Sequence, residues 1–344
     1  MFSYIFINLY IAFCDYLNTA LKNDRIKKYL IVSIIFILFF FQALRGNFTS
    51  DYDSYINRFN YYNFAFHENG FAFLLDVKDP LDALFHIILG VFTNNPVSIH
   101  IFYAIVTFSI LVYFLHLYKN SINSFMFLFL FVNAGFYYTG FNISRQIIAA
   151  MFLLLVFKDI EKIKMNRFII SILIISLIHF SSIIFLFIGI ILKVLLKNKK
   201  YNIHYLYMIL FTIIIFSIIY NGFINLYCEN ISTSFKGYKI TNLFLPVSIW
   251  LFIRFYSYYN KIKIDLRSLY YSDLYLIFCV AGLVFSLAVR FSYVFNFFTL
   301  IYLSKLLKIN TKYSKQLKIL IYFLGTLYTY ITLSGTGYDP YYFI

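Results

Sequence analysis

Long apolar runs separated by short basic segments dominate this chain and constrain its fold most strongly. A helix needs about 20 mostly apolar residues to cross a membrane, and runs of about that length recur along the whole sequence. Hydrophobic residues make up 62% and charged residues 12% of the 344 residues, whereas soluble domains are about half apolar and about a quarter charged. The sequence therefore predicts an all-α, polytopic transmembrane helical bundle.

The apolar runs give the number of membrane crossings. Single crossings are predicted at 2–20, 29–44, 98–118, 122–140, 145–158, 203–221, 243–259, 272–290, 292–307 and 317–334. The longer stretch 167–196 has basic segments at both ends, which should lie on the same side of the membrane. We interpret it as two short helices, 167–180 and 181–196, that meet at a polar elbow. The result is about 12 crossings in a single integral membrane domain, 1–344.

The basic residues indicate how the helices are oriented. A net charge of +15 could suggest a nucleic-acid partner, but the charge is concentrated in short segments between apolar runs, as the positive-inside rule describes. These segments are Lys22–Lys28, Lys158–Arg167, Lys193–Lys200, Arg254–Arg267 and Lys305–Lys318. Of the 29 Lys and Arg residues, 22 then face the cytoplasm and 7 do not, namely Arg45, Arg58, Lys78, Arg145, Lys236, Lys239 and Arg290. Both termini are expected outside, and no nucleic-acid partner is expected.

The largest predicted outer loop is 45–97. Its first part is polar and aromatic, and its second part carries a short apolar segment, Leu81–Phe92. That segment is too short to span a membrane alone, so we expect an interfacial or re-entrant helix.

Charged groups at membrane depth are energetically unfavourable, so each one is a candidate for a functional role. Arg45 follows the run 29–44, and Arg145 opens the run 145–158. Arginine in the first turn of a helix has the wrong sign for the helix dipole, and Ser144 is a candidate N-cap. Backbone donors together with Arg145 would form an anion site. A snorkelling side chain is the simpler explanation for Arg45.

Two further polar positions have competing explanations. His179 lies in the elbow of 167–196, where an isolated histidine often serves as a structural hydrogen-bonding group. Arg290 ends the predicted run 272–290, where a helix C-terminus favours a cation. Together with Arg45 and Arg145, these residues would surround an outer-leaflet cavity suited to an anionic lipid headgroup, best a diphosphate.

Metal and nucleotide chemistry are not indicated. Cys14, Cys228 and Cys279 lack metal-ligand spacing, and no Gly-rich phosphate loop is present. We expect no metal and no cofactor.

Five short motifs, in order, resemble a known family. Arg45-Gly46 precedes Ser50-Asp51-Tyr52-Asp53-Ser54-Tyr55, and Ser144-Arg145-Gln146-Ile147-Ile148-Ala149 opens a helix. They are followed by Ile178-His179-Phe180-Ser181, then Arg290-Phe291-Ser292-Tyr293, then Pro340-Tyr341. This series resembles the Wzy-type O-antigen polymerases of bacterial surface glycans, specifically their EpsG-like branch. Ser50 and Ser144 replace the Thr and Ile that are common in that family.

The resemblance implies a membrane glycosyltransferase of the bacterial inner membrane, with its active site facing the periplasm. Such an enzyme moves the growing glycan from undecaprenyl diphosphate to a hydroxyl of an undecaprenyl-diphosphate-linked oligosaccharide repeat. Candidate partners besides the bilayer and this substrate are a chain-length regulator and a flippase. The implied base is Asp51 or His179, and the sequence does not choose between them. The implied diphosphate- and sugar-binding residues are Arg45, Tyr52, Tyr55, Arg145, Gln146, Ser181 and Arg290.

Three other functions fit parts of the sequence. A lipid-linked oligosaccharide flippase also needs many helices and arginines, but it needs polar residues along a path open to both leaflets. An O-antigen ligase is the closest chemical alternative, and a structural scaffold would not need costly charges on one side. The surface glycan of a strain without the gene would separate these classes, since a single repeat on lipid A indicates loss of a polymerase.

The predicted topology can be tested by cysteine labelling. After the three native cysteines are replaced, single cysteines at Asn57 and Asn230 should react with a membrane-impermeant thiol reagent in intact spheroplasts. A cysteine at Asn198 should not react, because it lies in a basic inner segment. Labelling at Asn198 alone would invert the topology and place the candidate site in the cytoplasm.

Overall fold

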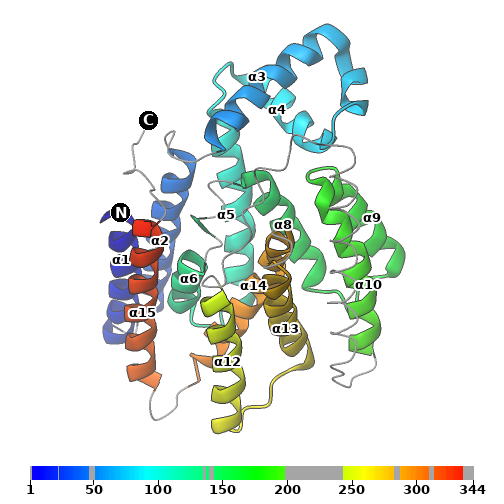
Figure 1. Cartoon of the computed structure of the whole chain (residues 1–344). Helices are drawn as coiled ribbons and strands as arrows, with labels where there is room; N and C mark the ends of the chain where they lie inside the picture. The colour runs from blue at the N-terminus through cyan, green and yellow to red at the C-terminus, as the bar shows by residue number, and fades with distance from the viewer. Residues whose placement is uncertain are drawn as a thin grey trace. The chain divides into compact units, whose positions relative to one another are not determined.

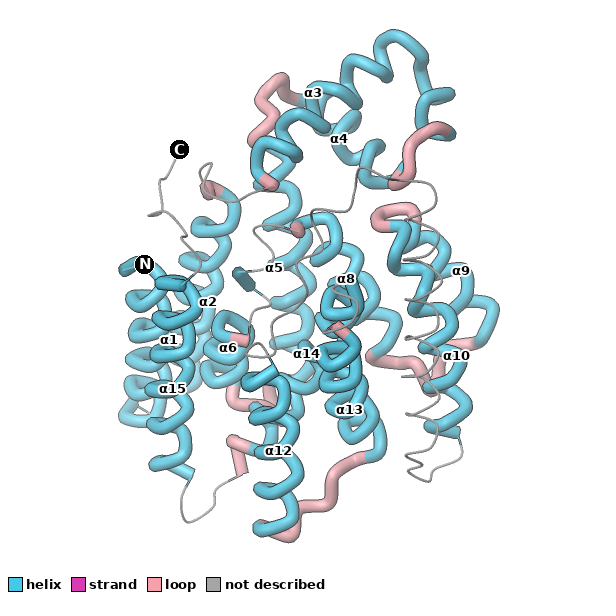
Figure 2. The backbone as a smooth tube through the Cα atoms, in the orientation of Figure 1, coloured by secondary structure: helices cyan, strands magenta, loops and turns pink. Residues whose placement is uncertain are grey.

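The computed structural model describes residues 2–21, 23–45, 51–134, 137–138, 143–197, 243–282, 287–309 and 314–335. Helices make up most of these segments (Figure 1, Figure 2). The chain divides into two compact units. The first comprises Met1–Leu153, Ile170–Ile183 and Leu307–Ile344, and the second comprises Leu154–Ile169 and Ile184–Leu306.

The first unit contains the N-terminal helices and the last helix. Its elements are α1 (Phe2–Leu21), α2 (Asp24–Ala43), α3 (Tyr52–Asn69), η1 (Gly70–Leu75), α4 (Pro80–Phe92), α5 (Ser98–Tyr118), α6 (Ser124–Asn133), the start of α8 (Ser144–Phe157), most of α9 (Met165–Ser176), η2 (Phe180–Ile183) and α15 (Ser314–Gly335).

Helix α6 forms the centre of this unit. All ten of its residues are buried, as expected of a helix that is apolar on every side. It packs against α1 and α15. The amides of Asn8 and Asn133 exchange two hydrogen bonds of 2.9 Å, and the Thr329 hydroxyl also donates to Asn133. These buried polar contacts link three helices, an arrangement common among membrane helices.

The segment between α2 and α5 contains two packed helices. Sequence analysis expected only a polar, aromatic stretch before Leu81, whereas α3 is an 18-residue helix. Its buried face is aromatic and follows helical spacing, with Tyr52, Tyr55, Phe59 and Tyr62. Mean hydropathy missed α3 because its other face is polar. The predicted short helix at Leu81–Phe92 is present as α4, beginning with Pro80 at its first position.

Close packing joins α3 to α4. The Asn63 amide on α3 donates to the carbonyl oxygens of Phe59 at 2.8 Å and His86 at 3.3 Å. A Cβ atom at Gly90 would lie 1.8 Å from the Asn63 side-chain oxygen. Glycine at this position therefore allows the two helices to approach each other.

The second unit contains α10 (Ile184–Lys197), α12 (Phe244–Tyr259), α13 (Leu266–Ala281) and α14 (Leu287–Leu306). Its core is aromatic. The rings of Phe278 and Phe295 stack at 5.7 Å, and the Phe157 ring lies edge-on to Phe295 at 5.8 Å. The Tyr271 hydroxyl donates to the Phe157 carbonyl oxygen at 2.8 Å, so it is satisfied inside this core.

Three described helices are long and apolar enough to cross a membrane: Asp24–Ala43, Ser98–Tyr118 and Phe180–Lys197. Four shorter apolar helices are Pro80–Phe92, Ser124–Asn133, Ser144–Phe157 and Met165–Ser176. The elbow predicted within 167–196 is present, because α9 ends at Ser176 and η2 begins at Phe180. The predicted crossing at 203–221 lies outside the described residues. The total of about 12 crossings and the orientation remain predictions.

The predicted boundary between the helices 272–290 and 292–307 is wrong. Sequence analysis placed Arg290 at the end of a helix 272–290, whereas α13 ends at Ala281 and α14 begins at Leu287. Arg290 therefore lies in the first turn of α14, and the favourable helix C-terminus proposed for it does not exist. The apolar run is nearly continuous here, so its hydropathy did not reveal where one helix stops and the next starts.

Candidate functional site

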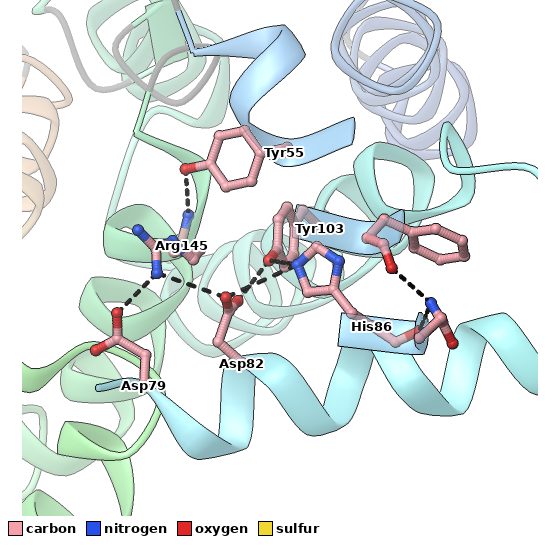
Figure 3. Close-up of polar contacts among 8 residues, drawn as sticks. Tyr55, Asp79, Asp82, His86, Tyr103 and Arg145 are labelled. Atoms are coloured by element: carbon pink, nitrogen blue, oxygen red, sulfur yellow. Dashed lines mark hydrogen bonds and ion pairs between the residues drawn. The ribbon is translucent and has the colours of Figure 1, made fainter. Parts of the chain in front are cut away.

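A group of polar residues in the first unit forms where six segments meet. They are the end of α2, the start of α3, the turn into α4, the first turns of α5, the start of α8, and the elbow between α9 and η2. Figure 3 shows the central contacts, with Arg145 between Asp79 and Asp82, and with Tyr103 and His86 beside Asp82. We call this group of residues the arginine centre.

Arg145 is held by two carboxylates. Its Nη1 atom lies 2.7 Å from Asp79 Oδ2 and 3.6 Å from Asp82 Oδ2. Its side chain is only 15% exposed, so the ion pairs are weakly screened by water. The dipole at the start of α8 opposes a cation in its first turn. The two carboxylates compensate for that unfavourable position.

Tyr55 contacts Arg145 in two ways. The Arg145 backbone N–H, one of the unpaired donors at a helix start, donates to the Tyr55 hydroxyl at 3.3 Å. The guanidinium carbon lies 6.0 Å from the centre of the Tyr55 ring, at the limit of a cation–π contact. Tyr55 therefore connects α3 to the start of α8.

Asp82 is the most deeply buried acid of the centre, with no exposed surface. The Tyr103 hydroxyl donates to its Oδ1 atom at 2.5 Å. Burial raises the pKa of Asp82 to about 6, although the nearby Arg145 charge and the Tyr103 hydrogen bond lower it. A carboxyl group with that pKa changes its protonation state close to neutral pH.

His86 lies one helical turn beyond Asp82 on α4. Its Nε2 atom is 3.8 Å from Asp82 Oδ2 and 3.3 Å from the Tyr103 hydroxyl. Burial first, and the Arg145 charge second, lower the pKa of His86 to about 3. The imidazole is therefore neutral at physiological pH, and its contact with Asp82 is a polar contact rather than an ion pair.

Arg45 forms the second cationic part of the centre and is 1% exposed. Its Nη2 atom lies 2.8 Å from His100 Nδ1 and 3.0 Å from the Ser144 hydroxyl. Because a guanidinium only donates, His100 accepts at Nδ1 and is neutral. The Tyr52 ring stacks on the His100 ring at 4.7 Å. These contacts fix the end of α2 against α3, α5 and α8.

Asp79 joins the elbow to Arg145. Its Oδ1 atom accepts a hydrogen bond of 2.8 Å from the Phe180 backbone N–H, while Oδ2 contacts Arg145. A second hydrogen bond joins the same two segments, because the Leu81 N–H donates to the Leu177 carbonyl oxygen at 3.0 Å. His179, between Leu177 and Phe180 in the chain, is thereby placed next to the arginine centre.

The structure brings together most of the residues predicted from sequence. Tyr55 contacts Arg145 directly, whereas Arg45 and Tyr52 join the same group through His100. The elbow with His179 and Ser181 is attached through Asp79. Asp51 precedes α3 and is partly exposed.

Three further residues that the sequence singled out are Ser144, Gln146 and Arg290. The α8 helix begins at Ser144 itself, whose hydroxyl accepts from Arg45, so the structure does not place Ser144 before the helix as an N-cap. Gln146 is buried, and its side-chain oxygen has no hydrogen-bond partner among the described residues. Arg290 belongs to the second unit and is exposed there.

Sequence analysis missed Asp79, Asp82, His86, His100 and Tyr103. A signal for two of them was present, because Asp82 and His86 are four residues apart inside an apolar segment and so share one helix face. The rule that polar groups in apolar runs need an explanation applies to them as well as to His179. Within the described segments, no three His, Cys, Asp or Glu side chains are grouped as metal ligands.

The fold and the centre define a class of protein. This is an all-helical membrane protein with a buried arginine bonded to a neutral histidine and a largely buried arginine paired with carboxylates. A sequence model of the EpsG family matches residues 28–343, a range that includes every residue of the arginine centre. The chain belongs to the EpsG family. No curated protein and no solved structure matches it.

The pKa of Asp82 leads to a test by pH. In the unfolded chain this carboxyl has its ordinary pKa near 3.8, whereas in the folded protein it is about 6. Between these values the folded state binds more protons, so its stability should fall as pH rises. We expect the melting temperature of the detergent-solubilised protein to fall between about pH 4 and 6, and Asp82→Asn to remove part of that fall.

The control is Asp24→Asn, which removes an exposed carboxylate from the first unit. It should leave the shape of the pH profile unchanged. Parallel profiles for the wild type and Asp82→Asn would contradict the raised pKa.

Proposed function

We propose that this EpsG-family protein is a polysaccharide polymerase of the bacterial inner membrane. It transfers a growing glycan from undecaprenyl diphosphate to a hydroxyl of a lipid-linked oligosaccharide repeat at the periplasmic face. Membership of the EpsG family supports a polymerase-type function. The finer proposal rests on two neighbouring arginines, because buried Arg45 bonds to Ser144, which directly precedes the largely buried Arg145.

The chemistry requires a site that stabilises a departing diphosphate. A bond forms between the anomeric carbon and the acceptor oxygen, the bond from that carbon to the diphosphate oxygen breaks, and the acceptor proton passes to a base. Negative charge grows on the diphosphate during this step. Guanidinium groups fixed before the reaction stabilise such charge without reorganising, and their planar form suits phosphate oxygens.

The contacts of Arg145 leave part of its guanidinium available. Nη1 is occupied by Asp79, whereas Nε has no hydrogen-bond partner among the described residues. The buried Nε–H is a donor that costs free energy while unsatisfied. Under this proposal a diphosphate oxygen satisfies it, while Asp79 keeps the side chain in position.

Asp82 adjusts the charge of the centre. With a pKa of about 6, it loses its proton only near neutral pH. A phosphate dianion bound close to Arg145 would raise that pKa further, because a neighbouring negative charge disfavours ionisation. Asp82 would then be protonated in the complex. Arg145 would face one carboxylate and the diphosphate instead of two carboxylates.

The base is Asp51 or His179. Each is next in sequence to a residue that contacts the centre, since Asp51 precedes Tyr52 and His179 precedes Phe180. We favour Asp51, because it is partly exposed at the start of α3, where a carbohydrate acceptor can reach it. His179 then serves to bind the diphosphate.

Arg145→Lys tests the proposed function. A lysine keeps the charge but loses the planar donor pair, so polymer synthesis should fall by roughly 10²-fold, the effect of losing one donor to a developing oxyanion. Purified protein should be assayed with a lipid-linked repeat, and chain length scored on gels. The control is Arg167→Lys, an exposed arginine in the first turn of α9. Normal chain length for Arg145→Lys at equal expression would remove Arg145 from the diphosphate site.

A second pair of variants assigns the base. If Asp51 accepts the proton, Asp51→Asn should lower turnover by roughly 10²–10⁴ while the lipid-linked donor still binds. His179→Gln should then mainly weaken donor binding. The opposite pattern would assign the base to His179. Full chain extension by both variants would exclude both residues. Binding and extension must therefore be measured separately.

A further inference from the structure

A second polar site of the first unit lies far from the arginine centre. It is a pocket of about 180 Å³ where α1 ends and where α2, α6 and α15 begin. Lys27 lies in the first turn of α2, which ends at Ala43, and Arg45 lies two residues beyond that end. The helix rises by 16 residues from Lys27 to Ala43, or about 24 Å. This is close to the thickness of the hydrocarbon core of a bilayer, about 30 Å.

The pocket carries a net positive charge. Lys27, Lys308 and Lys318 line it together with one acid, Asp15. Three positive charges and one negative charge leave a net charge of +2. The Lys308 ammonium donates to the Asn120 carbonyl oxygen. The Lys27 ammonium makes no hydrogen bond or ion pair with the residues that the structure describes.

Asp15 is already engaged and does not neutralise the pocket. It is 5% exposed and accepts a hydrogen bond of 3.0 Å from the Tyr322 hydroxyl. The Asn123 amide lies 3.5 Å from it, and Lys318 Nζ lies 3.9 Å away. The positive-inside rule explains why lysines occur in these segments. It does not explain why three of them line one pocket around a buried carboxylate.

The remaining lining groups suit an anion with several oxygen atoms. Asn18, Thr19 and Ser124 supply hydrogen-bonding side chains, and Ile122 and Phe125 form a buried apolar wall. Lysines bind phosphate as point charges. The volume corresponds to about six waters, which fits a phosphate with part of its ester. It is smaller than the roughly 300 Å³ of the smallest usual pockets for drug-sized ligands.

We propose that this pocket binds a phosphate group, supplied by the headgroup of an anionic membrane lipid. The helices around it favour a lipid over a soluble phosphate. Exposed tyrosines, Tyr16 and Tyr29, lie near the pocket ends of α1 and α2, where aromatic side chains mark the headgroup level of a bilayer. Exposed Phe13 and Val32 lie about one turn deeper on the same two helices, where acyl chains would run. The predicted topology places this end in the cytoplasmic leaflet.

The test compares two double variants of the full chain. Lys27→Gln with Lys318→Gln removes two lysines from the pocket. Lys28→Gln with Lys315→Gln removes two exposed lysines from the same segments, outside the pocket. Native mass spectrometry in a neutral detergent measures binding of phosphatidylglycerol against phosphatidylcholine. We expect the first pair to weaken phosphatidylglycerol binding by at least about tenfold and the second pair to match the wild type.

Asp15→Asn should change the phosphatidylglycerol affinity in the opposite direction to the lysine variants. Removing the negative charge should tighten phosphatidylglycerol binding, whereas loss of a merely structural contact would not. This variant and Lys27→Gln alone decide the question if the double pocket variant does not purify in a single state. Equal affinities for both double variants, or no preference for phosphatidylglycerol, would overturn the proposal.

A final measurement separates the two sources of phosphate. Melting temperatures are compared in inorganic phosphate and in chloride at equal ionic strength. A lipid site predicts stabilisation by phosphatidylglycerol that depends on Lys27 and Lys318, with little effect of inorganic phosphate. Stabilisation by inorganic phosphate that needs both lysines, without a preference for phosphatidylglycerol, would assign the pocket to a soluble anion and reject the lipid.

Discussion

The contact between Asp79 and Arg145 is the interaction on which the candidate site depends. One oxygen of Asp79 holds the guanidinium at 2.7 Å, and the other accepts the Phe180 N–H at 2.8 Å. Three segments far apart in sequence, the turn into α4, the start of α8 and the elbow, therefore share a single carboxylate. Removing one partner of a buried ion pair costs about 3–5 kcal/mol. Loss of Asp79 would disturb both Arg145 and the elbow.

The segment between α2 and α5 supplies the other half of the site because it is folded rather than a loose loop. The aromatic face of α3 brings Tyr52 to His100 and Tyr55 to Arg145. Its contact with α4 through Asn63 and Gly90 positions Asp82 beneath Arg145. The packing of α3 against α4 thus contributes to the position of Asp82.

The sequence predicted the helices better than the tertiary contacts between them. Hydropathy and basic segments identified most helices and the elbow, and the cost of charge in apolar runs identified Arg45, Arg145 and His179. It did not reveal that Arg145 faces Asp79, because an ion pair across 66 residues is set by tertiary packing. It overlooked α3 because an amphipathic helix has low mean hydropathy, and it misplaced Arg290 because apolar runs do not mark a break between consecutive helices.

The arginine centre contains charged groups whose burial a purely structural core would avoid. A buried ion pair is often no more stabilising than apolar residues of the same volume, and Arg145 also opposes the dipole of its own helix. Leucine-like residues at Arg145, Asp79 and Asp82 would fill this space without desolvating three charges. The protein instead keeps a cation with an unsatisfied Nε–H and an acid whose pKa lies near 6. Under the proposed function, a bound diphosphate would satisfy this donor and favour the neutral form of Asp82.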